Sequence, residues 1–162
     1  PVMDEALRRD PGLSFEVVGG QRVNRLYRDL PRATVVHQMK WPAYQAFLAM
    51  PGRHVGLAPL LDGPFNRARS FTKFFDITRG GAAGIYAAGG ACAEVVTPGV
   101  DGLVVEMKPE AWVDAIARLA RDDALRQTLL DNARRKVAEL AQRAQAGYPD
   151  LTAGWSRARD PS

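Results

Sequence analysis

Cysteine and histidine are scarce in this chain, and their scarcity excludes several kinds of site. The 162 residues include one cysteine, Cys92, and two histidines, His37 and His54. A single cysteine cannot form a disulfide within the chain, which favours a reducing compartment such as the cytoplasm. The spacing of these potential ligands matches no known zinc motif, so we expect no bound metal.

Long apolar runs and familiar catalytic motifs are missing as well. No apolar stretch approaches the ~20 residues needed to cross a bilayer, and the charged start of the chain does not resemble a signal peptide. The chain contains neither a G-x-x-x-x-G-K-[ST] phosphate loop nor a G-x-S-x-G elbow, which argues against an NTPase and a serine hydrolase. Because the chain opens on Pro1 rather than Met, we expect it to belong to a longer polypeptide.

The chain carries only a small excess of positive charge. Its net charge of +4 is too small to imply a nucleic-acid partner by itself, and we expect none. The basic run at residues 134–136 is expected to form a solvated helix face.

Short apolar runs alternate with helical patterns along the chain. We expect strands at residues 15–18, 33–37, 54–57, 84–88 and 103–105. We expect helices at residues 2–9, 23–30, 42–50, 70–79 and 93–96, and two more that begin at Pro109 and after Asp122. The strands are short and mainly apolar rather than alternating, as in sheets covered on both faces. The pattern predicts an α/β fold with a doubly wound, Rossmann-like parallel sheet over residues 1–146, followed by a tail over residues 147–162.

Doubly wound sheets bind ligands in the loops outside the carboxyl ends of their strands. In this sequence the predicted loops are Gly19-Gly20, residues 38–41, residues 60–70 and Gly89-Gly90. Glycines directly after a strand let the backbone approach a ligand closely, although a plain turn needs them equally. We therefore expect any ligand site to be built from these four loops.

Cations gather at the start of the predicted helix at residues 70–79. Ser70 is a suitable N-cap, Lys73 stands in the first turn, and Arg67 and Arg69 come just before. A helix start is partially positive and disfavours each exposed cation by a few tenths to ~1 kcal/mol, whereas a bound phosphate would reverse that cost. Alternatively, the cations point to water and Lys73 pairs with Asp76 at i+3. The residues alone leave both interpretations open.

Three further features of this region lead to predictions. Asp76 could accept hydrogen bonds from a ribose diol. Gly80-Gly81 is expected to end the helix, and with Gly84 to permit close approach of helix and strand. Cys92 is expected to be a small buried apolar residue, because both histidines fall in predicted strands and offer it no partner.

An ordered series of motifs resembles the donor-binding, C-terminal half of GT-B glycosyltransferases. The series consists of His54 to Leu60, Phe65 to Ser70, Lys73 to Asp76, Gly84, Glu94 to Val96, Gly99, Gly102 to Val105 and the Trp112 helix. It is closest to the retaining group-1 enzymes, and the resemblance covers residues 15–140. It implies an enzyme, a hexosyltransferase, that moves a sugar from a UDP- or GDP-linked donor to a saccharide or lipid-linked acceptor. It implies polysaccharide or lipopolysaccharide biosynthesis, and neither a cofactor nor a metal.

The resemblance also implies roles for individual residues. Asp76 falls where the family has a glutamate that holds the ribose. The family's sugar-contacting glutamate falls at Ala68, which implies that Asn66 or Ser70 contacts the sugar instead. The resemblance and the cations together imply a donor site of Asn66, Arg69, Ser70, Phe71, Thr72, Lys73, Asp76, Gly19, Met39 and Lys40. Phe71 and Thr72 would face the diphosphate through backbone N–H groups, Met39 and Lys40 would border the base, and no catalytic residue is assigned.

In this family an acceptor-binding domain and the first strand of the donor domain precede the residues present here. We therefore expect a C-terminal part that lacks this first strand and is inactive alone. We expect the full-length enzyme in the cytoplasm, associated with the inner face of the membrane. One alternative is a non-catalytic nucleotide-binding or interaction module of the same fold. A sugar-nucleotide epimerase ranks last, because neither histidine falls in a predicted loop.

Overall fold

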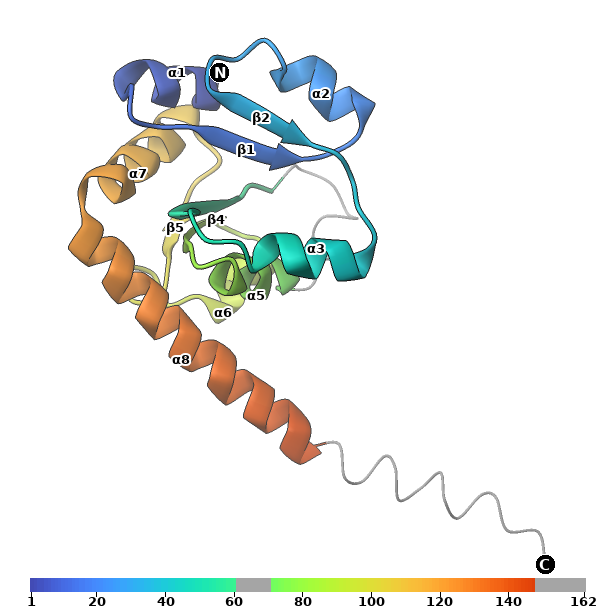
Figure 1. Cartoon of the computed structure of the whole chain (residues 1–162). Helices are drawn as coiled ribbons and strands as arrows, with labels where there is room; N and C mark the ends of the chain where they lie inside the picture. The colour runs from blue at the N-terminus through green and yellow to red at the C-terminus, as the bar shows by residue number, and fades with distance from the viewer. Residues whose placement is uncertain (61–70, 148–162) are drawn as a thin grey trace, which may run out of the picture.

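The computed structural model describes residues 1–60 and 71–147, so Asn66, Arg69 and Ser70 lie outside the described residues. The elements are α1 (Val2–Arg9), β1 (Phe15–Val18), α2 (Gln21–Tyr27), β2 (Ala33–Val36), α3 (Trp41–Leu48), β3 (Val55–Ala58), α5 (Thr72–Arg79), β4 (Ala83–Ala87), α6 (Ala91–Val95), β5 (Leu103–Val105), α7 (Pro109–Arg121) and α8 (Asp123–Gly147) (Figure 1). Strands and helices alternate as predicted, with ends that differ by a few residues. The α/β fold is confirmed.

All strand pairs are parallel, and they form two sheets. In the first sheet β1 pairs with β2, with Phe15 opposite Ala33. In the second sheet β4 lies between β3 and β5, with Val55 opposite Ala83 and Ile85 opposite Leu103. Within residues 1–60 and 71–147 no ladder joins β1 to β3. The division between two sheets was not visible in the sequence, because apolar runs locate strands but do not specify their neighbours.

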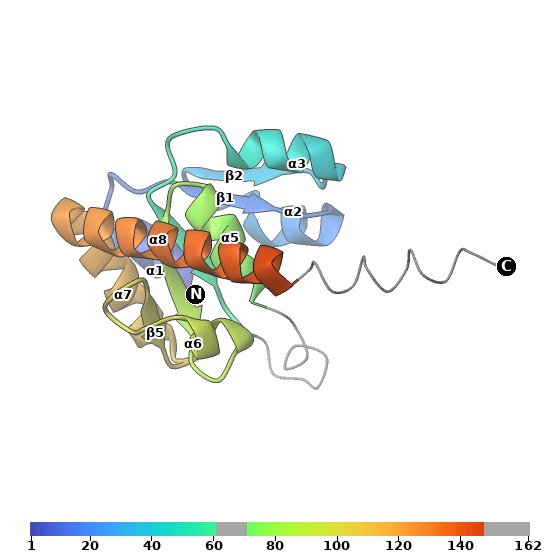
Figure 2. The same cartoon turned by 90° about the horizontal axis from the view of Figure 1, so that it is seen from below.

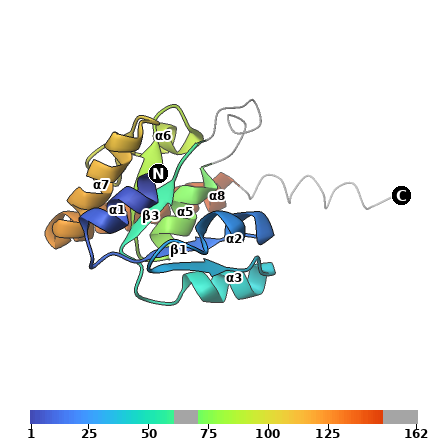
Figure 3. The same cartoon turned by 90° about the horizontal axis from the view of Figure 1, so that it is seen from above.

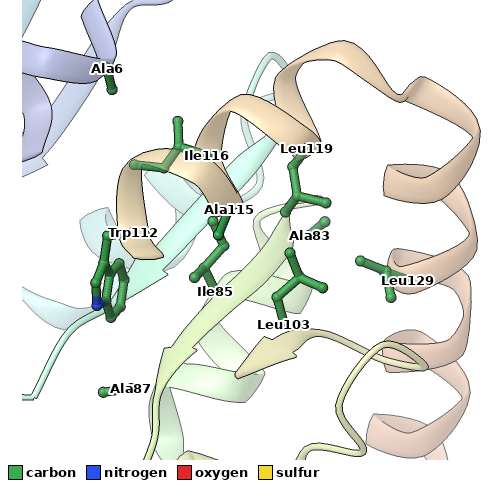
Figure 4. Packing of buried hydrophobic residues seen from close by; sticks show 10 residues of the cluster. All are labelled: Ala6, Ala83, Ile85, Ala87, Leu103, Trp112, Ala115, Ile116, Leu119 and Leu129. Carbon is green, nitrogen blue, oxygen red and sulfur yellow. The ribbon is translucent and has the colours of Figure 1, made fainter. Parts of the chain in front are cut away.

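Helices cover both faces of the β3–β4–β5 sheet (Figures 2 and 3). On one face Ala83, Ile85 and Ala87 pack against α1 and α7, in a cluster that also includes Leu103 and Leu129 (Figure 4). On the other face Tyr86 packs with Phe74 of α5, Val96 and Ala133 of α8. The strand β4 alternates between the two clusters, as the pleat of a strand requires.

The buried core belongs almost entirely to one half of the molecule. Between residues 8 and 60 the only buried residue is Gly19, and neither α2 nor α3 buries a side chain. Nearly all the other buried residues lie in or next to the β3–β4–β5 sheet and the helices that cover it. The β1–β2 sheet and its helices therefore have little packing of their own.

The roles predicted for the glycines near β3 and β4 are confirmed only in part. The helix α5 ends as expected: Gly81 has a positive φ of 74°, and the Ala82 N–H donates to Ile77 O as in a Schellman motif. The close approach of α5 to the sheet is at Gly56, where an added Cβ would lie 2.5 Å from Ile77 Cγ2. The prediction for Gly84 is wrong, because the space beside it is filled by Tyr86 of the same strand.

The long helix α8 begins as predicted but presents one of its basic residues inward. Leu129 and Ala133 are buried on the predicted apolar stripe, and Arg134 and Arg135 are exposed. Lys136 instead donates to Val95 O at 2.8 Å and pairs with Asp101. The expectation of a fully solvated face at residues 134–136 is therefore wrong for Lys136, since charge composition does not show which side of a helix a lysine occupies.

Replacing the cap of α8 should destabilise the protein moderately. The Leu125 N–H donates to Asp122 Oδ1 at 2.8 Å, so Asp122→Ala should lower the free energy of unfolding by about 1 kcal/mol. Urea denaturation of Asp122→Ala and Asp122→Ser would measure it. Asp122→Ser should retain most of the stability, and an equal loss in both variants would show that the cap contributes little.

Candidate functional site

The helix α5 begins outside the carboxyl end of β3, with a positive first turn. The position before its first residue is occupied by Phe71, which provides no side-chain cap. The helix therefore begins at Thr72, later than predicted, and Ser70, the predicted N-cap, lies outside the described residues. The first turn contains no acidic residue and includes Lys73. Because the first N–H groups of a helix lack intrahelical acceptors, this end combines backbone donors with a cation and suits an anion.

Asp76 lies one turn further along α5 and links it to α3. Its Oδ2 lies 3.4 Å from Lys73 Nζ, and the Tyr44 hydroxyl donates to the same oxygen at 3.2 Å. The Asp76 side chain is 11% exposed, whereas that of Lys73 is 56% exposed. The local pair that the sequence offered as one alternative is present. An exposed lysine gains little from such a pair, so Lys73 keeps most of its capacity to meet an anion.

Tyr44 is a site residue that sequence reasoning missed. Burial raises the pKa of its phenol, and the neighbouring charge of Asp76 raises it further. The hydroxyl is therefore neutral at physiological pH and acts as a hydrogen-bond donor to the carboxylate. The only signal in the sequence was the placement of Tyr44 on the apolar face of the predicted helix at residues 42–50, which suggested packing rather than a polar contact.

The loop after β4 and the short helix α6 lie beside the first turn of α5. Gly89 has a positive φ of 77° and connects β4 to α6. Cys92 of α6 is half-buried against the cluster of Phe74 and Tyr86. Burial raises the pKa of the Cys92 thiol, while the Phe74 backbone amide and the Lys73 ammonium oppose that rise. The thiol therefore packs as a neutral group next to the start of α5.

The loops after β1 and β2 lie next to one another. Gly19 is buried, and an added Cβ would lie 2.5 Å from the Val23 side chain, so the glycine lets α2 pack closely. Met39 is half-buried and Lys40 is exposed. The Lys40 carbonyl accepts the Tyr44 N–H at 3.0 Å. Tyr44 thus connects the loop after β2 to Asp76 in α5, which brings two parts of the predicted site together.

The start of α3 also presents an aromatic surface. Trp41 is largely exposed and packs on Tyr44, with ring centroids 5.9 Å apart. An open hollow between α3 and α5 is lined by Trp41, Gln45, Leu48, Ala49 and Arg79. A planar aromatic group could lie against this surface.

The two histidines do not lie within strands, which corrects a prediction. The strand β2 ends at Val36, whose carbonyl accepts the Gly19 N–H, and the exposed His37 follows in the loop. The strand β3 begins at Val55, directly after His54. The partner strands set these ends, and residue propensity alone could not locate them. His37 therefore stands at the carboxyl edge of the β1–β2 sheet, and the reason for ranking an epimerase last no longer holds.

The described residues contain neither a cluster of metal ligands nor a membrane-spanning helix. No group of three or more histidine, cysteine, aspartate or glutamate side chains there could hold a metal ion. No helix in residues 1–60 or 71–147 is long and apolar enough to cross a membrane.

No family model and no curated protein matches this sequence, but its structure is similar to solved structures. Anabaena HepE in complex with UDP-glucose matches with a TM-score of 0.62, 17% identity and coverage of 90% of this chain and 43% of that chain. Sucrose-phosphate synthase from Thermosynechococcus elongatus matches with a TM-score of 0.65 and 22% identity, over 94% of this chain and 42% of that chain. A glycosyltransferase from Rickettsia africae matches with a TM-score of 0.58 and 16% identity, over 85% and 38%.

The shared architecture is that of GT-B glycosyltransferases. This chain spans less than half the length of the matched chains. It therefore has the Rossmann-like fold of one half of a GT-B enzyme, as the sequence motifs predicted.

Proposed function

We propose that this chain binds the nucleotide part of a nucleotide-sugar donor, as the C-terminal half of a retaining group-1 glycosyltransferase. The observation that carries the proposal is the positive first turn of α5 beside the nearly buried Asp76, at the carboxyl end of β3 in a GT-B-like half. A diphosphate requires concentrated positive charge, and a ribose requires a fixed acceptor. The matched Anabaena HepE structures, which contain UDP-glucose, UDP with glucose, or UDP, support a uridine nucleotide as the first ligand to test.

The diphosphate would lie against the first turn of α5. Backbone N–H groups near Phe71 and Thr72 would donate to it, and Lys73 would add a mobile charge. Arg69, Ser70 and Asn66, in residues outside the described ranges, would complete this side of the site. During sugar transfer the leaving diphosphate gains charge, and donors already held in place would stabilise that charge.

Asp76 would hold the ribose. Tyr44 and Lys73 both contact Oδ2, which would fix the orientation of the carboxylate and leave Oδ1 directed to the ribose diol. The base would then lie near Met39 and Lys40 at the start of α3, and Gly19 would line the cleft.

The activity of the whole enzyme is part of the same proposal. Residues 1–146 would form the donor domain and residues 147–162 a tail. An acceptor-binding domain elsewhere in the polypeptide would complete a cytoplasmic hexosyltransferase at the inner face of the membrane. It would transfer sugar to a saccharide or lipid-linked acceptor in polysaccharide or lipopolysaccharide biosynthesis, without a cofactor, and this chain alone would be inactive.

Calorimetric titration with UDP and GDP tests the nucleotide site. Asp76→Ala removes a charged acceptor and should weaken binding roughly 10- to 100-fold. Lys73→Ala removes an exposed charge and should weaken it only about two- to fivefold. Arg134→Ala and Asp131→Ala are matched controls, because they break an i,i+3 pair of the same kind on α8, at 3.3 Å, and should leave binding unchanged.

Two results would count against the nucleotide site. One is the absence of binding at about 1 mM UDP and GDP by a chain whose circular dichroism shows an intact fold. The other is an equal loss of affinity in the Asp76 and Asp131 variants, because Asp131 lies on the remote helix α8.

A further inference from the structure

The helix α3 lies on the outside of the molecule and has little packing of its own (Figures 2 and 3). None of its side chains is buried, and five of its eight residues are exposed. Tyr44, Phe47 and Leu48 are only partly buried. A helix this short is marginal by itself, so α3 depends on the contacts at its two ends.

At its carboxyl end α3 is held tightly by Arg53. The Arg53 Nη1 group donates to Phe47 O at 2.8 Å and to Met50 O at 2.9 Å. Its Nε group donates to Glu16 Oε1 of β1 at 2.7 Å. The guanidinium also lies 4.0 Å from the centroid of the Phe47 ring, in a cation–π contact. These short contacts make the carboxyl end of α3 a fixed point that is shared with β1 and the segment before β3.

At its amino end α3 is held loosely. The Tyr44 hydroxyl lies 3.2 Å from Asp76 Oδ2, whereas a hydroxyl normally approaches a carboxylate oxygen to about 2.5–2.7 Å. Lys73 Nζ lies 3.4 Å from the same oxygen, also beyond the usual distance of about 2.7–2.9 Å. Two donors therefore share Oδ2, and neither is in full contact with it.

A bound diphosphate would draw one of these two donors away. The Lys73 side chain is 56% exposed and can turn toward a phosphate, whereas the Asp76 side chain is 11% exposed. The carboxylate would then lose a donor on Oδ2, which costs free energy at a site so little exposed. Tyr44 is the other donor, and it can reach full contact only if the amino end of α3 moves toward α5.

We propose that α3 is a movable strap over the donor site. It pivots at its carboxyl end on Arg53, and its amino end closes against α5 through the Tyr44–Asp76 hydrogen bond when a nucleoside diphosphate binds. Closure carries Met39 and Lys40, which directly precede α3, toward the nucleotide. Open and closed forms exchange without ligand, and the ligand shifts the population to the form that it binds better. The inference rests on the proposed nucleotide site at Asp76.

Distances between pairs of spin labels, measured by double electron–electron resonance on the 162-residue chain, test the strap. In a Cys92→Ala background, labels are attached at Ala43→Cys and Ala138→Cys, two exposed positions on α3 and α8. Without nucleotide the distances should divide into an open and a closed population. Saturating UDP, or GDP if that is the nucleotide that binds, should lower the open fraction roughly threefold or more. A matched pair at Met50→Cys and Ala138→Cys reports on the pivot and should not change.

Tyr44→Phe separates closure from binding. It removes the hydroxyl and keeps the ring that packs on Trp41, so the affinity for UDP in calorimetry should fall about three- to tenfold. The labels at positions 43 and 138 should keep the open population even when calorimetry shows that the site is saturated. Tyr27→Phe is the matched control, because it removes a hydroxyl of α2 that donates to no described residue, and it should leave closure intact.

Each of the other outcomes overturns the strap. An unchanged distance distribution in a chain that binds UDP would retain the nucleotide site and exclude the closure. A single closed population without nucleotide would show that α3 does not move. Equal shifts at Ala43 and Met50 would exclude a pivot at Arg53, and complete closure in Tyr44→Phe would exclude the role of this hydroxyl. If a folded chain binds neither UDP nor GDP at about 1 mM, the nucleotide site fails and the closure fails with it.

Discussion

Lys136→Met is expected to lower the free energy of unfolding by roughly 3 kcal/mol, because it leaves the Asp101 carboxylate buried without its counter-ion. The Asp101 side chain is 2% exposed and its Oδ2 pairs with Lys136 Nζ. The other oxygen, Oδ1, accepts the Thr97 N–H at 2.8 Å. Lys136 also contacts Val95 O and Thr97 Oγ1, so the substitution removes several contacts that join α8 to the segment between α6 and β5.

Urea denaturation with a matched control would measure this effect. Lys108→Met breaks an ion pair with Glu106 in which the side chains are 72% and 67% exposed. It should change stability by less than ~1 kcal/mol, since exposed pairs are worth little. Adding Asp101→Asn to Lys136→Met should restore part of the loss, because the buried charge is then gone. Equal effects of the two lysine substitutions would mean that burial does not strengthen the Asp101 pair.

Gly84→Ala is expected to cost about 2 kcal/mol, because the new methyl group would overlap the ring of Tyr86. A Cβ at Gly84 would meet Tyr86 Oη and Cζ, and one at Gly102 would lie 2.7 Å from Tyr86 Cε2. Tyr86 is almost completely buried between these glycines, and burial raises the pKa of its phenol. The ring has little freedom to move away, so the strain should appear as lost stability.

A double-mutant cycle separates this overlap from other effects of the added methyl group. In the Tyr86→Leu background, Gly84→Ala should cost much less, because the atoms that it meets have been removed. Gly20→Ala is the matched control, since a Cβ there would come no closer than 3.8 Å to Gln38 Oε1. A penalty at Gly84 that persists without the tyrosine ring would contradict the explanation.

The strands and most helix ends could be predicted because each depends on local residues. Compact apolar runs between turn residues located β1 and β5, and Gly80-Gly81 marked the end of α5. The contacts that organise the candidate site could not be predicted, because they join residues far apart in sequence. Tyr44 meets Asp76 across two helices, and Lys136 meets Asp101 across the segment before β5. A single sequence contains no signal for side-chain contacts between residues that lie far apart in the chain.

The division into sheets was hidden for a related reason. The apolar runs at β1 and β3 predict buried strands. The sequence of such a run does not show whether another strand pairs with it in the sheet. At Lys73 the sequence did indicate the contact that the structure shows. It offered two interpretations, an anion site and a local pair with Asp76. The contact with Asp76 does not prevent the lysine from meeting an anion.

The uneven distribution of the core has a consequence for how this chain unfolds. Residues 8–60 contribute one buried residue, so the β1–β2 half should open at lower denaturant than the β3–β4–β5 half, and unfolding need not be a single cooperative transition. Trp41 belongs to the first half and is exposed, whereas Trp112 is buried in the second. The third tryptophan of the sequence is Trp155, so replacing both Trp41 and Trp155 by phenylalanine would make Trp112 fluorescence a selective probe of the half that contains Gly84 and Lys136.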